Sequence, residues 1–383
     1  MFRLMLSAAI SGAIHYYVWH RYTRRTEMPV RWRRIIAVAM VVLWISIPLT
    51  TALRNVDAGV ASAMSWVSMP WMAFAGLSFV VLIALDAGLL AIAIYKRIAK
   101  KQPIAPDLSR RRFLARVTGG TAAAVAGASV ARGMIEARGE HEVVDVEITL
   151  PKLPKALDGF TIVQLTDLHV GLTIDRHFVQ RVVDKANKLS PDLVALTGDF
   201  VDGKVADLHE EIAPLAGLRA KHGVFAVTGN HEYYSGVEPW VTQISTLGVR
   251  YLRNERVVIG DANASFELAG VEDHNATGKH KEDLAAATLG RDPNRALVLL
   301  AHQPRQVKRA ALHGVDLQLS GHTHGGQIWP WHYIVKLQQG GLLAGRYQHQ
   351  ATQLYVSRGC GYWGPPVRVL APLEITRVIL RAA

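Results

Sequence analysis

Two long apolar stretches near the N-terminus constrain what this chain can fold into. Residues 35–53 carry no charge, and residues 71–95 carry a single acid, Asp86. About 20 apolar residues cross the core of a bilayer as a helix. Residues 4–19 are also apolar but shorter, and they contain His15. We therefore predict transmembrane helices at these three places, in preference to buried helices of a soluble core.

The basic residues between these stretches predict their orientation. Residues 20–34 contain six arginines and residues 96–116 are again strongly basic, whereas the loop expected at 54–70 has one basic and one acidic side chain. Because basic loops stay in the cytoplasm, the first and third loops are expected inside and the N-terminus outside. An acid within a span, such as Asp86, is a candidate functional residue. The alternative is a polar contact between neighbouring helices.

A fourth segment follows a motif that resembles an export signal. Ser109–Leu114 has the sequence SRRRFL and precedes a weakly apolar run at residues 117–135. The motif is similar to a twin-arginine signal, which the twin-arginine export machinery recognises. Basic residues before any span that starts inside would look partly similar. Both interpretations make 117–135 a signal-anchor that leads outward, with Ala126–Ala128 as a candidate processing site.

The charge of the chain is divided unevenly along its length. The net charge is +12, and this whole excess lies in residues 1–140, while residues 141–383 contain as many acidic as basic side chains. The C-terminal part therefore lacks the basic footprint of a nucleic-acid-binding domain. A single cysteine, Cys360, excludes an intrachain disulfide. We predict a membrane region at 1–140 and a separate domain at 141–383.

The domain at 141–383 alternates between strand and helix patterns. Several strands are near-continuous apolar runs, as expected of strands covered on both faces, and their alternation with helices predicts an α/β fold. The predicted strands are Val143–Leu150, Thr161–Thr166, Leu193–Gly198, Val224–Gly229, Ala296–Ala301, Asp316–Gly321, Gln353–Ser357 and Ile375–Leu380. The predicted helices are Phe178–Leu189, Leu208–Arg219 and Gln306–His313.

Side chains that bind metals follow five of the predicted strands. In chain order they are Asp167 and His169, then Asp199, then Asn230 with His231 and Glu232, then His302, then His322 and His324. Ligands of open α/β sheets bind at the carboxyl ends of strands, so these side chains are expected to converge. Imidazole, carboxylate and amide oxygen suit Mn²⁺, Fe²⁺/Fe³⁺ or Zn²⁺, and the absence of cysteine ligands argues against a structural zinc site.

The spacing of the last two histidines carries its own prediction. If residues 322–324 were extended, the alternation of side chains would send both imidazoles to the same side. The glycines before and after the pair would leave room for the backbone to approach the site.

Taken in order, D-x-H, G-D, G-N-H-E, H and G-H-x-H resemble the motifs of the calcineurin-like metallophosphoesterase superfamily, over about residues 143–383. Asn230–Tyr234 (NHEYY), His302–Pro304 (HQP) and Ser357–Gly361 (SRGCG) are similar to its membrane-anchored bacterial branch. The resemblance implies a four-layer α-β-β-α sandwich of two mixed sheets, here preceded by an all-α transmembrane region.

The resemblance also implies a role for each residue. Two divalent metal ions would be held, one by Asp167, His169 and His324 and the other by Asn230, His302 and His322, with Asp199 shared between them. A bridging hydroxide would attack phosphorus. His231 would stabilise or protonate the leaving oxygen, or alternatively form only a supporting hydrogen bond. Glu232 would anchor its loop, and the weaker candidates for substrate contact are Asp202, His274 and Arg358.

The implied activity is hydrolysis of a phosphate ester, above all a phosphodiester, at the outer face of a bacterial inner membrane. Tethering suggests a lipid-linked or cell-wall substrate, and the exposed aromatics expected at residues 326–335 would rest on the lipid bilayer or pack near the site. Some relatives cleave the pyrophosphate of a UDP-linked lipid precursor, but that substrate is cytoplasmic. The alternative of another class is a non-catalytic, membrane-tethered metal-binding module.

Overall fold

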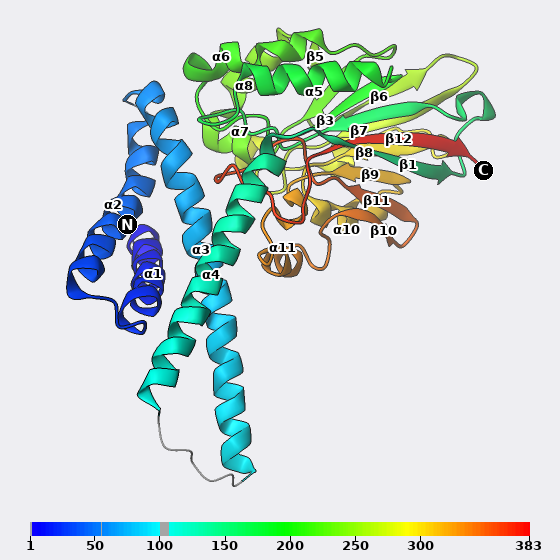
Figure 1. The fold of residues 1–383 in the computed structure, drawn as a ribbon. Helices are drawn as coiled ribbons and strands as arrows, with labels where there is room; N and C mark the ends of the chain where they lie inside the picture. The colour runs from blue at the N-terminus through cyan, green and yellow to red at the C-terminus, as the bar shows by residue number, and fades with distance from the viewer. Residues whose placement is uncertain (1, 55, 100–106) are drawn as a thin grey trace. The chain divides into compact units, whose positions relative to one another are not determined.

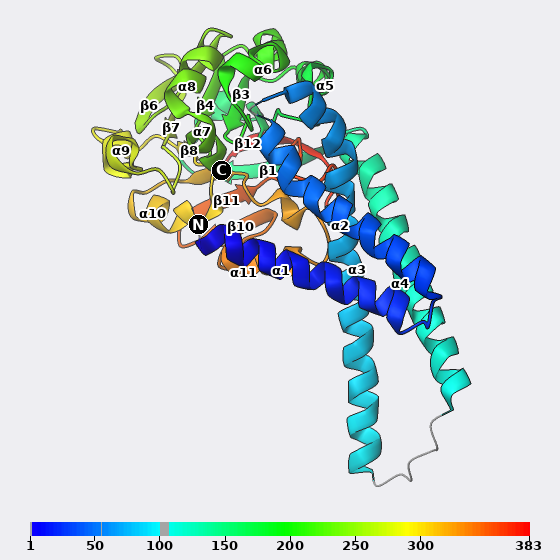
Figure 2. The same cartoon turned by 90° about the vertical axis from the view of Figure 1, so that its left-hand side faces the viewer.

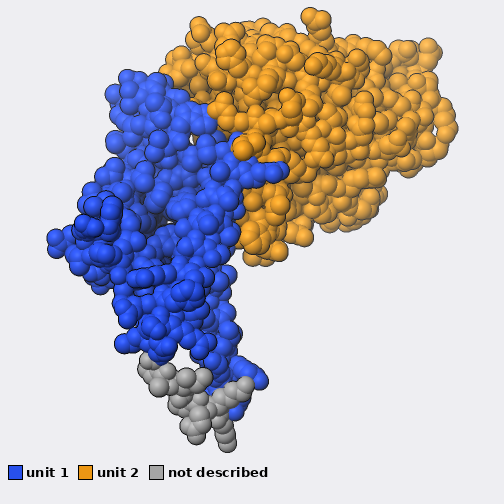
Figure 3. All heavy atoms as spheres, viewed as in Figure 1, with its two compact units in different colours: residues 1–134, 364–367 blue, residues 135–363, 368–383 orange. Residues whose placement is uncertain are grey.

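The computed structural model describes residues 2–54, 56–99 and 107–383 (Figure 1). The chain divides into two compact units, residues 1–134 with 364–367, and residues 135–363 with 368–383 (Figure 3). The division thus falls six residues before the boundary predicted at 140/141. The reason is Ala137, which is fully buried in the hydrophobic core of the second unit.

Four α-helices make up most of the first unit. Its α-helices are α1 (Phe2–Trp19), α2 (Val30–Leu53), α3 (Ala58–Ile98) and α4 (Leu108–Arg138), and a π-helical turn follows α1 at His20–Arg24. Helices α2, α3 and α4 are long and apolar enough to cross a membrane. The helix expected at 4–19 forms as α1. Polar residues such as His15 lower its mean hydropathy, so it is not among the helices apolar enough to cross a membrane.

The loop predicted at 54–70 is wrong over most of its length. Helix α3 already begins at Ala58, because the Asp57 side chain caps it by accepting a hydrogen bond from the Val60 N–H at 3.0 Å. The small and apolar residues that follow continue the helix into the predicted span. Part of the basic segment predicted at 96–116 lies outside the described residues, which resume at residue 107.

Asp86, the acid within the third predicted span, is paired inside the helical unit. Its carboxylate lies 3.1 Å from the guanidinium of Arg21 and 3.8 Å from that of Arg25, and it accepts a hydrogen bond from Tyr17 at 2.7 Å. A charge in an apolar environment is tolerated when an opposite charge and hydrogen bonds compensate it. The contact between helices is therefore sufficient to explain Asp86.

Two six-stranded sheets form the second unit. The first sheet has the order β1-β12-β2-β3-β4-β5 and the second has the order β10-β11-β9-β8-β7-β6. Strands of the first sheet are β1 (Glu142–Leu150), β2 (Thr161–Leu165), β3 (Leu193–Thr197), β4 (Val224–Val227), β5 (Val249–Tyr251) and β12 (Glu374–Ala382). Strands of the second are β6 (Glu255–Gly260), β7 (Ser265–Gly270), β8 (Leu297–Leu300), β9 (Leu317–Ser320), β10 (Gly345–His349) and β11 (Thr352–Val356).

Both sheets are mixed, as the resemblance implied. In the first sheet β12 pairs antiparallel with β2, whereas β2, β3 and β4 run parallel to one another. In the second, the outer pairs β10–β11 and β6–β7 are antiparallel and the inner strands β7, β8 and β9 are parallel. All eight predicted strands are present. The strands β5, β6, β7 and β10 were not predicted, and of these β5 has only three residues.

Helices cover the outer face of each sheet. On the first sheet they are α5 (Arg176–Lys188), α6 (Val205–Ile212) and α8 (Val237–Ser245), and on the second α9 (Leu284–Thr288) and α10 (Val307–Leu312). Two more helices, α7 (Asn230–Ser235) and α11 (His332–Gln338), belong to the loops that follow β4 and β9. The helix predicted at 208–219 is α6, and it ends early, where Pro214 starts a 3₁₀ turn.

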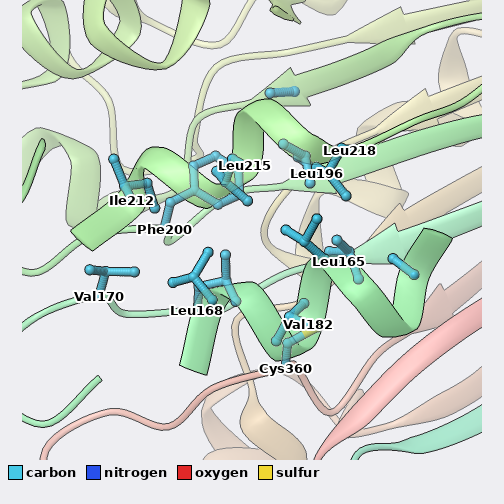
Figure 4. Close-up of a cluster of buried hydrophobic side chains, with 14 of the residues drawn as sticks. Leu165, Leu168, Val170, Val182, Leu196, Phe200, Ile212, Leu215, Leu218 and Cys360 are labelled. Atoms are coloured by element: carbon cyan, nitrogen blue, oxygen red, sulfur yellow. The ribbon is translucent and has the colours of Figure 1, made fainter. Parts of the chain in front are cut away.

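Three buried clusters separate the four layers. The first packs α5 and α6 on the first sheet, and it includes Val182 of α5, Ile212 of α6 and Leu165 of β2 (Figure 4). The second fills the space between the sheets, where Phe160 and Phe266 meet edge to face at 5.2 Å. The third packs α9 and α10 on the second sheet. This α-β-β-α sandwich places the carboxyl ends of the parallel strands, and the loops that follow them, along one side of the unit.

Candidate metal centre

The structure brings the strand-end residues together in two groups. Asp167, His169 and His324 form one, and Asp199, His302 and His322 form the other; within each group, ligand atoms lie within 4.8 Å of one another. A third set, His169, Asp199 and His231, overlaps both groups. The first group has the residues that the resemblance implied, and the second contains Asp199 beside His302 and His322. Four loops contribute to these two groups, after β2, β3, β8 and β9, and Asn230 and His231 follow β4. These loops are distant from one another in the sequence, and the parallel strands bring them together.

In the first group, imidazole nitrogens face each other. Nε2 of His169 lies 3.1 Å from Nε2 of His324, and that nitrogen lies 3.5 Å from Oδ1 of Asp167. Two ring nitrogens and a carboxylate oxygen that converge in this way offer three ligand atoms to a cation placed between them.

The second group has the same character and is linked to the first by Asp199. Nε2 of His302 lies 3.2 Å from Nδ1 of His322 and 3.0 Å from Oδ2 of Asp199. The same oxygen of Asp199 lies 3.8 Å from Nε2 of His169 in the first group. Asp199 therefore stands between the groups, where one carboxylate can reduce the repulsion between two cations.

Asn230 tests whether a metal ion fits the residues present. Its side-chain oxygen Oδ1 is buried and has no hydrogen-bond partner among the described residues. A buried acceptor without a partner costs about 1–3 kcal/mol. The cost is removed when the oxygen coordinates a cation, so this orphaned oxygen and the converging nitrogens fit a metal centre.

Hydrogen bonds on the far side of the rings fix which nitrogen can ligate. Nδ1 of His302 lies 2.8 Å from the carbonyl oxygen of Thr197, so Nδ1 carries the proton and Nε2 keeps its lone pair for the site. Nδ1 of His169 makes an ion-pair contact of 3.2 Å with Oδ2 of Asp202, without the geometry of a hydrogen bond, and its Nε2 again lies toward the site. Partners of this kind are typical of metal-ligating histidines.

The electrostatics of the site are those of converging negative charge. Burial disfavours the charged form of His302, but the Asp199 carboxylate outweighs it and raises the pKa of His302 to about 10. Burial also disfavours the charged form of His169, but the Asp202 carboxylate outweighs it and raises the pKa of His169 to about 9. In contrast, burial together with the nearby positive charge of His302 lowers the pKa of His322 to about 3. Divalent cations would take the place of the protons on His302 and His169.

The backbone at the site is strained. Five of the candidate ligands adopt the left-handed conformation, which residues other than glycine rarely adopt: Asp167 (φ 56°), His169 (53°), Asp199 (56°), His322 (72°) and His324 (51°). Such strain clusters at functional sites. The prediction that residues 322–324 are extended is wrong, because left-handed turns, and not strand alternation, aim the two imidazoles.

Gly321 allows the closest approach in the site. A Cβ at this position would lie 2.2 Å from Oδ2 of Asp167 and 2.2 Å from Oγ1 of Thr166. The expectation that a glycine before the histidine pair admits the backbone therefore holds at Gly321. The main-chain N–H of His322 then donates to both oxygens of Asp167 at 3.0 Å.

His231 lies at the edge of the two groups, in the first turn of α7. Its Nδ1 lies 2.5 Å from Oδ1 of Asp202, and its Nε2 lies 4.0 Å from Oδ2 of Asp199. Two rings flank its imidazole, Tyr234 at 5.2 Å and Trp363 at 5.7 Å between centroids. Nδ1–H of His231 thus donates to Asp202, and Nε2 can face a substrate.

Glu232, the next residue, is a fully buried anchor for this loop. Its carboxylate accepts hydrogen bonds from the N–H groups of Asp199, Phe200 and Gly229 at 2.7–3.0 Å. Burial and the neighbouring Asp199 charge raise the pKa of Glu232 to about 7. The three N–H donors oppose that shift by stabilising the ionised form. Glu232 thus holds the loops after β3 and β4 together.

The three weaker candidates for substrate contact differ in their position relative to the site. Asp202 lies inside the site, where it contacts His231 and His169. Arg358 is engaged with Glu374 at 2.6 Å and Glu142 at 2.7 Å, so its guanidinium is already compensated. His274 lies 3.6 Å from Glu282, and no distance in the described residues ties it to either metal group. Substrate contact by these three stays a prediction.

Arg368 is a buried residue beside the site that the motifs did not predict. Its guanidinium is 1% exposed and donates to several main-chain carbonyls, including that of Gly361. One of its terminal nitrogens lies 3.3 Å from Nδ1 of His324. The only signal in the sequence is a single arginine within the apolar run VRVLA.

Together, the double-sheet sandwich and the paired ligand groups at its strand ends define a metallophosphoesterase-type α/β protein. Comparisons with known proteins agree. The sequence pattern of the calcineurin-like phosphoesterase family matches residues 160–326. A metallophosphoesterase of Bacillus subtilis is 32% identical over 285 residues, which cover 72% of this chain and 98% of that protein. The chain belongs to the calcineurin-like phosphoesterase family.

Relatives come from bacteria and from animals. A metallophosphoesterase of Helicobacter pylori is 42% identical over 248 residues, covering 64% of this chain and 65% of that protein. The Bos taurus protein named "Transmembrane protein with metallophosphoesterase domain" is 40% identical over 266 residues, covering 66% of this chain and 60% of that protein. The match thus spans slightly less than two thirds of these two relatives, and similarity does not single out a bacterial branch.

Proposed function

We propose that this chain is a membrane-associated, metal-dependent hydrolase of phosphate esters. The observation that carries the proposal is the pair of ligand groups joined by Asp199, together with the orphaned Oδ1 of Asn230. Asp167, His169 and His324 would hold one divalent ion, and Asn230, His302 and His322 the other. Such ions lower the pKa of a water toward neutrality and stabilise charge on phosphoryl oxygens.

The chain's own residues supply the rest of the chemistry. His231 would donate a proton from Nε2 to the leaving oxygen, which is the work of a general acid. Asp202 supports this role by accepting from Nδ1, which fixes the ring orientation and stabilises its charged form. The loop anchor Glu232 keeps Asp199 and Asn230 at fixed positions.

A phosphodiester is the substrate class we favour. Nothing in the ligand groups requires a doubly charged monoester, and the flanking rings of Tyr234 and Trp363 leave apolar surface on the leaving-group side of His231. The pyrophosphate of a UDP-linked lipid precursor is the second candidate. A membrane-bound substrate is consistent with three helices long and apolar enough to span a bilayer.

We further propose that the catalytic domain faces the outer side of the membrane. The basic segments at 20–34 and 96–116 favour cytoplasmic loops, and α4 would then lead outward. The SRRRFL motif before α4 supports the same direction. A reporter-fusion map that put residue 383 in the cytoplasm would overturn this topology.

Hydrolysis by the purified full-length chain tests the proposed activity. With Mn²⁺ added, we expect turnover of bis(p-nitrophenyl) phosphate, faster than that of p-nitrophenyl phosphate. The Asp199→Asn variant should lose it, whereas Asp207→Asn, on the exposed face of α6, should not. Absence of turnover on both substrates in a metal-loaded wild-type chain would favour the non-catalytic metal-binding module instead.

A further inference from the structure

Exposed apolar side chains of the second unit gather beside the candidate metal centre. Six of them form what we call the apolar rim: Trp329, Tyr333, Ile334, Leu337, Trp363 and Leu370. From β1 to the C-terminus only four other large hydrophobic side chains are exposed: Tyr234, Val258, Leu289 and Leu312. Exposed apolar side chains scattered singly need no explanation, but a concentrated patch marks an interaction surface.

The rim is attached to the catalytic residues by direct contacts. The ring of Trp363 packs against that of His231 at 5.7 Å. The main chain of Trp363 exchanges two hydrogen bonds, both at 2.9 Å, with the side chain of Gln327. Gln327 follows the ligand His324 by three residues. The rim thus continues from the edge of the site.

Helix α11 presents the largest part of the rim. Leu337 lies one turn after Tyr333 and Ile334, and all three are exposed. The start of the helix is seated on the metal loop, since a Cβ at Gly326 would lie 2.3 Å from His332. A short helix with an exposed apolar face and a firmly packed base is suited to contact something outside the protein.

Leu370 gives the rim a second, independent sign of function. It adopts a left-handed conformation with φ of 59° and is 82% exposed. Its neighbour Val369 is bonded to the rim segment, because the Trp329 N–H donates to the Val369 carbonyl at 3.1 Å. A leucine held in this conformation with its side chain in solvent contributes no burial to the folded core, and strained residues of this kind cluster at functional sites.

The composition of the rim fits a membrane surface. Trp and Tyr favour the interface between lipid and water. Residues 326–346, which contain α11, include Lys336 and Arg346 but no acidic residue. Basic and aromatic side chains without acids complement an anionic lipid surface.

The chain also keeps this domain close to lipid. Helix α4, a candidate span, ends at Arg138, and β1 begins at Glu142. The three residues between them reach at most about 11 Å when extended. A domain with so short a connection to a membrane span meets lipid at a high effective concentration.

We propose that the apolar rim docks on the bilayer surface and holds the candidate metal centre against lipid headgroups. The inference concerns the surface of the domain and does not require that the proposed hydrolysis occurs. It assigns to α11 and Leu370 a role that folding and metal binding do not explain.

Depth-dependent quenching in proteoliposomes tests the proposal on the full-length chain. The only native cysteine, Cys360, is buried, so Leu337→Cys allows a fluorophore to be attached at the rim alone. Leu289→Cys is the matched control, since Leu289 is 80% exposed and Leu337 82%. Leu289 follows α9, which packs beside β6 at the opposite edge of the second sheet from β10 (Figure 2).

Lipids that carry a doxyl quencher just below the headgroup should quench the label at position 337 by about twofold or more, as for a side chain 5–10 Å into the interface. The label at position 289 should be unaffected. No quenching at 337, or equal quenching at both positions, overturns the proposal. A label at 337 that is shielded from aqueous iodide but not quenched by lipid would mark a protein partner or a second copy, which also overturns it.

Activity separates this proposal from the proposed function. In the variant Tyr333→Ser/Ile334→Ser/Leu337→Ser, hydrolysis of soluble bis(p-nitrophenyl) phosphate should stay at the wild-type rate. Hydrolysis of a phosphodiester lipid within vesicles should fall at least several-fold. If the wild-type chain hydrolyses neither substrate, the proposed function fails while the quenching result still decides the docking.

Discussion

The carboxylate of Asp202 lies 2.5 Å from Nδ1 of His231, which directs the other ring nitrogen of His231 toward the candidate metal centre. Asp202 also lies 3.2 Å from Nδ1 of His169, a candidate ligand. One carboxylate thus orients both a ligand and the proposed general acid. We propose a positioning role for Asp202, and its contact with substrate remains a separate prediction.

Asp202→Asn should reduce kcat by roughly 100-fold or more, since the amide no longer stabilises a charged imidazole at His231. Bound metal should change little, because the Nε2 atom of His169 keeps its place in the site. The leaving group gives the decisive readout: the loss should be larger for an alcohol leaving group, which needs the proton that the oriented His231 donates, than for p-nitrophenolate. Asp207→Asn provides the control, and equal losses on both substrate types would argue for a purely structural Asp202.

His231→Ala should keep both metal ions and lose most turnover. The loss is expected to be about 10²–10⁴-fold for substrates with an alcohol leaving group, which needs a proton. It should be smaller for p-nitrophenyl esters, because p-nitrophenolate departs without one. His209→Ala, on the exposed face of α6, serves as control. Equal losses on both substrate types would mean that His231 does not act as an acid.

Gly321→Ala should disrupt the centre without any change of ligand. The new Cβ would lie 2.2 Å from an Asp167 carboxylate oxygen, so the carboxylate or the loop has to move. Overpacking of this kind costs about 1–3 kcal/mol, and metal content should fall. In Gly120→Ala, where no atom lies within 4 Å, metal content should be unchanged. Full metal occupancy in the Gly321 variant would contradict the close approach.

Acid should destabilise the catalytic domain through His141. Burial lowers the pKa of His141 to about 4, and its Nε2 lies 2.8 Å from the carbonyl oxygen of Cys360. The unfolded chain takes up this proton near pH 6.5, so between pH 6.5 and 4 the unfolded state binds more protons. The contribution of neutral His141 to the free energy of unfolding is fully present above pH 6.5, and it falls by about 3 kcal/mol as the pH drops to 4.

The thiol of Cys360 reports this effect directly. It is fully buried and is the only cysteine, so its reaction with a maleimide in increasing denaturant follows unfolding of this domain alone. His141→Gln removes the titrating group and should flatten the pH dependence of the midpoint between pH 6.5 and 4. The same slope in the variant and the wild type would place the acid sensitivity elsewhere.

Much of the fold follows from local pattern. Mostly apolar runs, and in β1 an alternating pattern, predicted the eight strands, because strands that face a core bury mainly apolar side chains. The edge strand β6 is largely exposed and has no such pattern. The start of α3 at Ala58 was missed because a capping contact, between Asp57 and Val60, decides it and not hydropathy.

For the candidate site, the sequence predicted which side chains meet but not how they are held. Strand ends brought Asp167, Asp199 and His302 together, and parallel pairing in the structure accounts for this. The aim of His322 and His324 depends on left-handed backbone conformations that a pattern of residue types does not encode. Arg368 and the His231–Asp202 pair depend on tertiary contacts between loops distant in sequence.

The number of metal ions bound per chain tests the central claim most directly. Elemental analysis of the purified full-length chain, after incubation with Mn²⁺ and removal of free metal, should give two ions per chain. Asp199→Asn should give one or none, because the carboxylate between the two groups is lost. One ion in the wild-type chain, or two that Asp199→Asn leaves in place, would contradict a two-metal centre joined by Asp199.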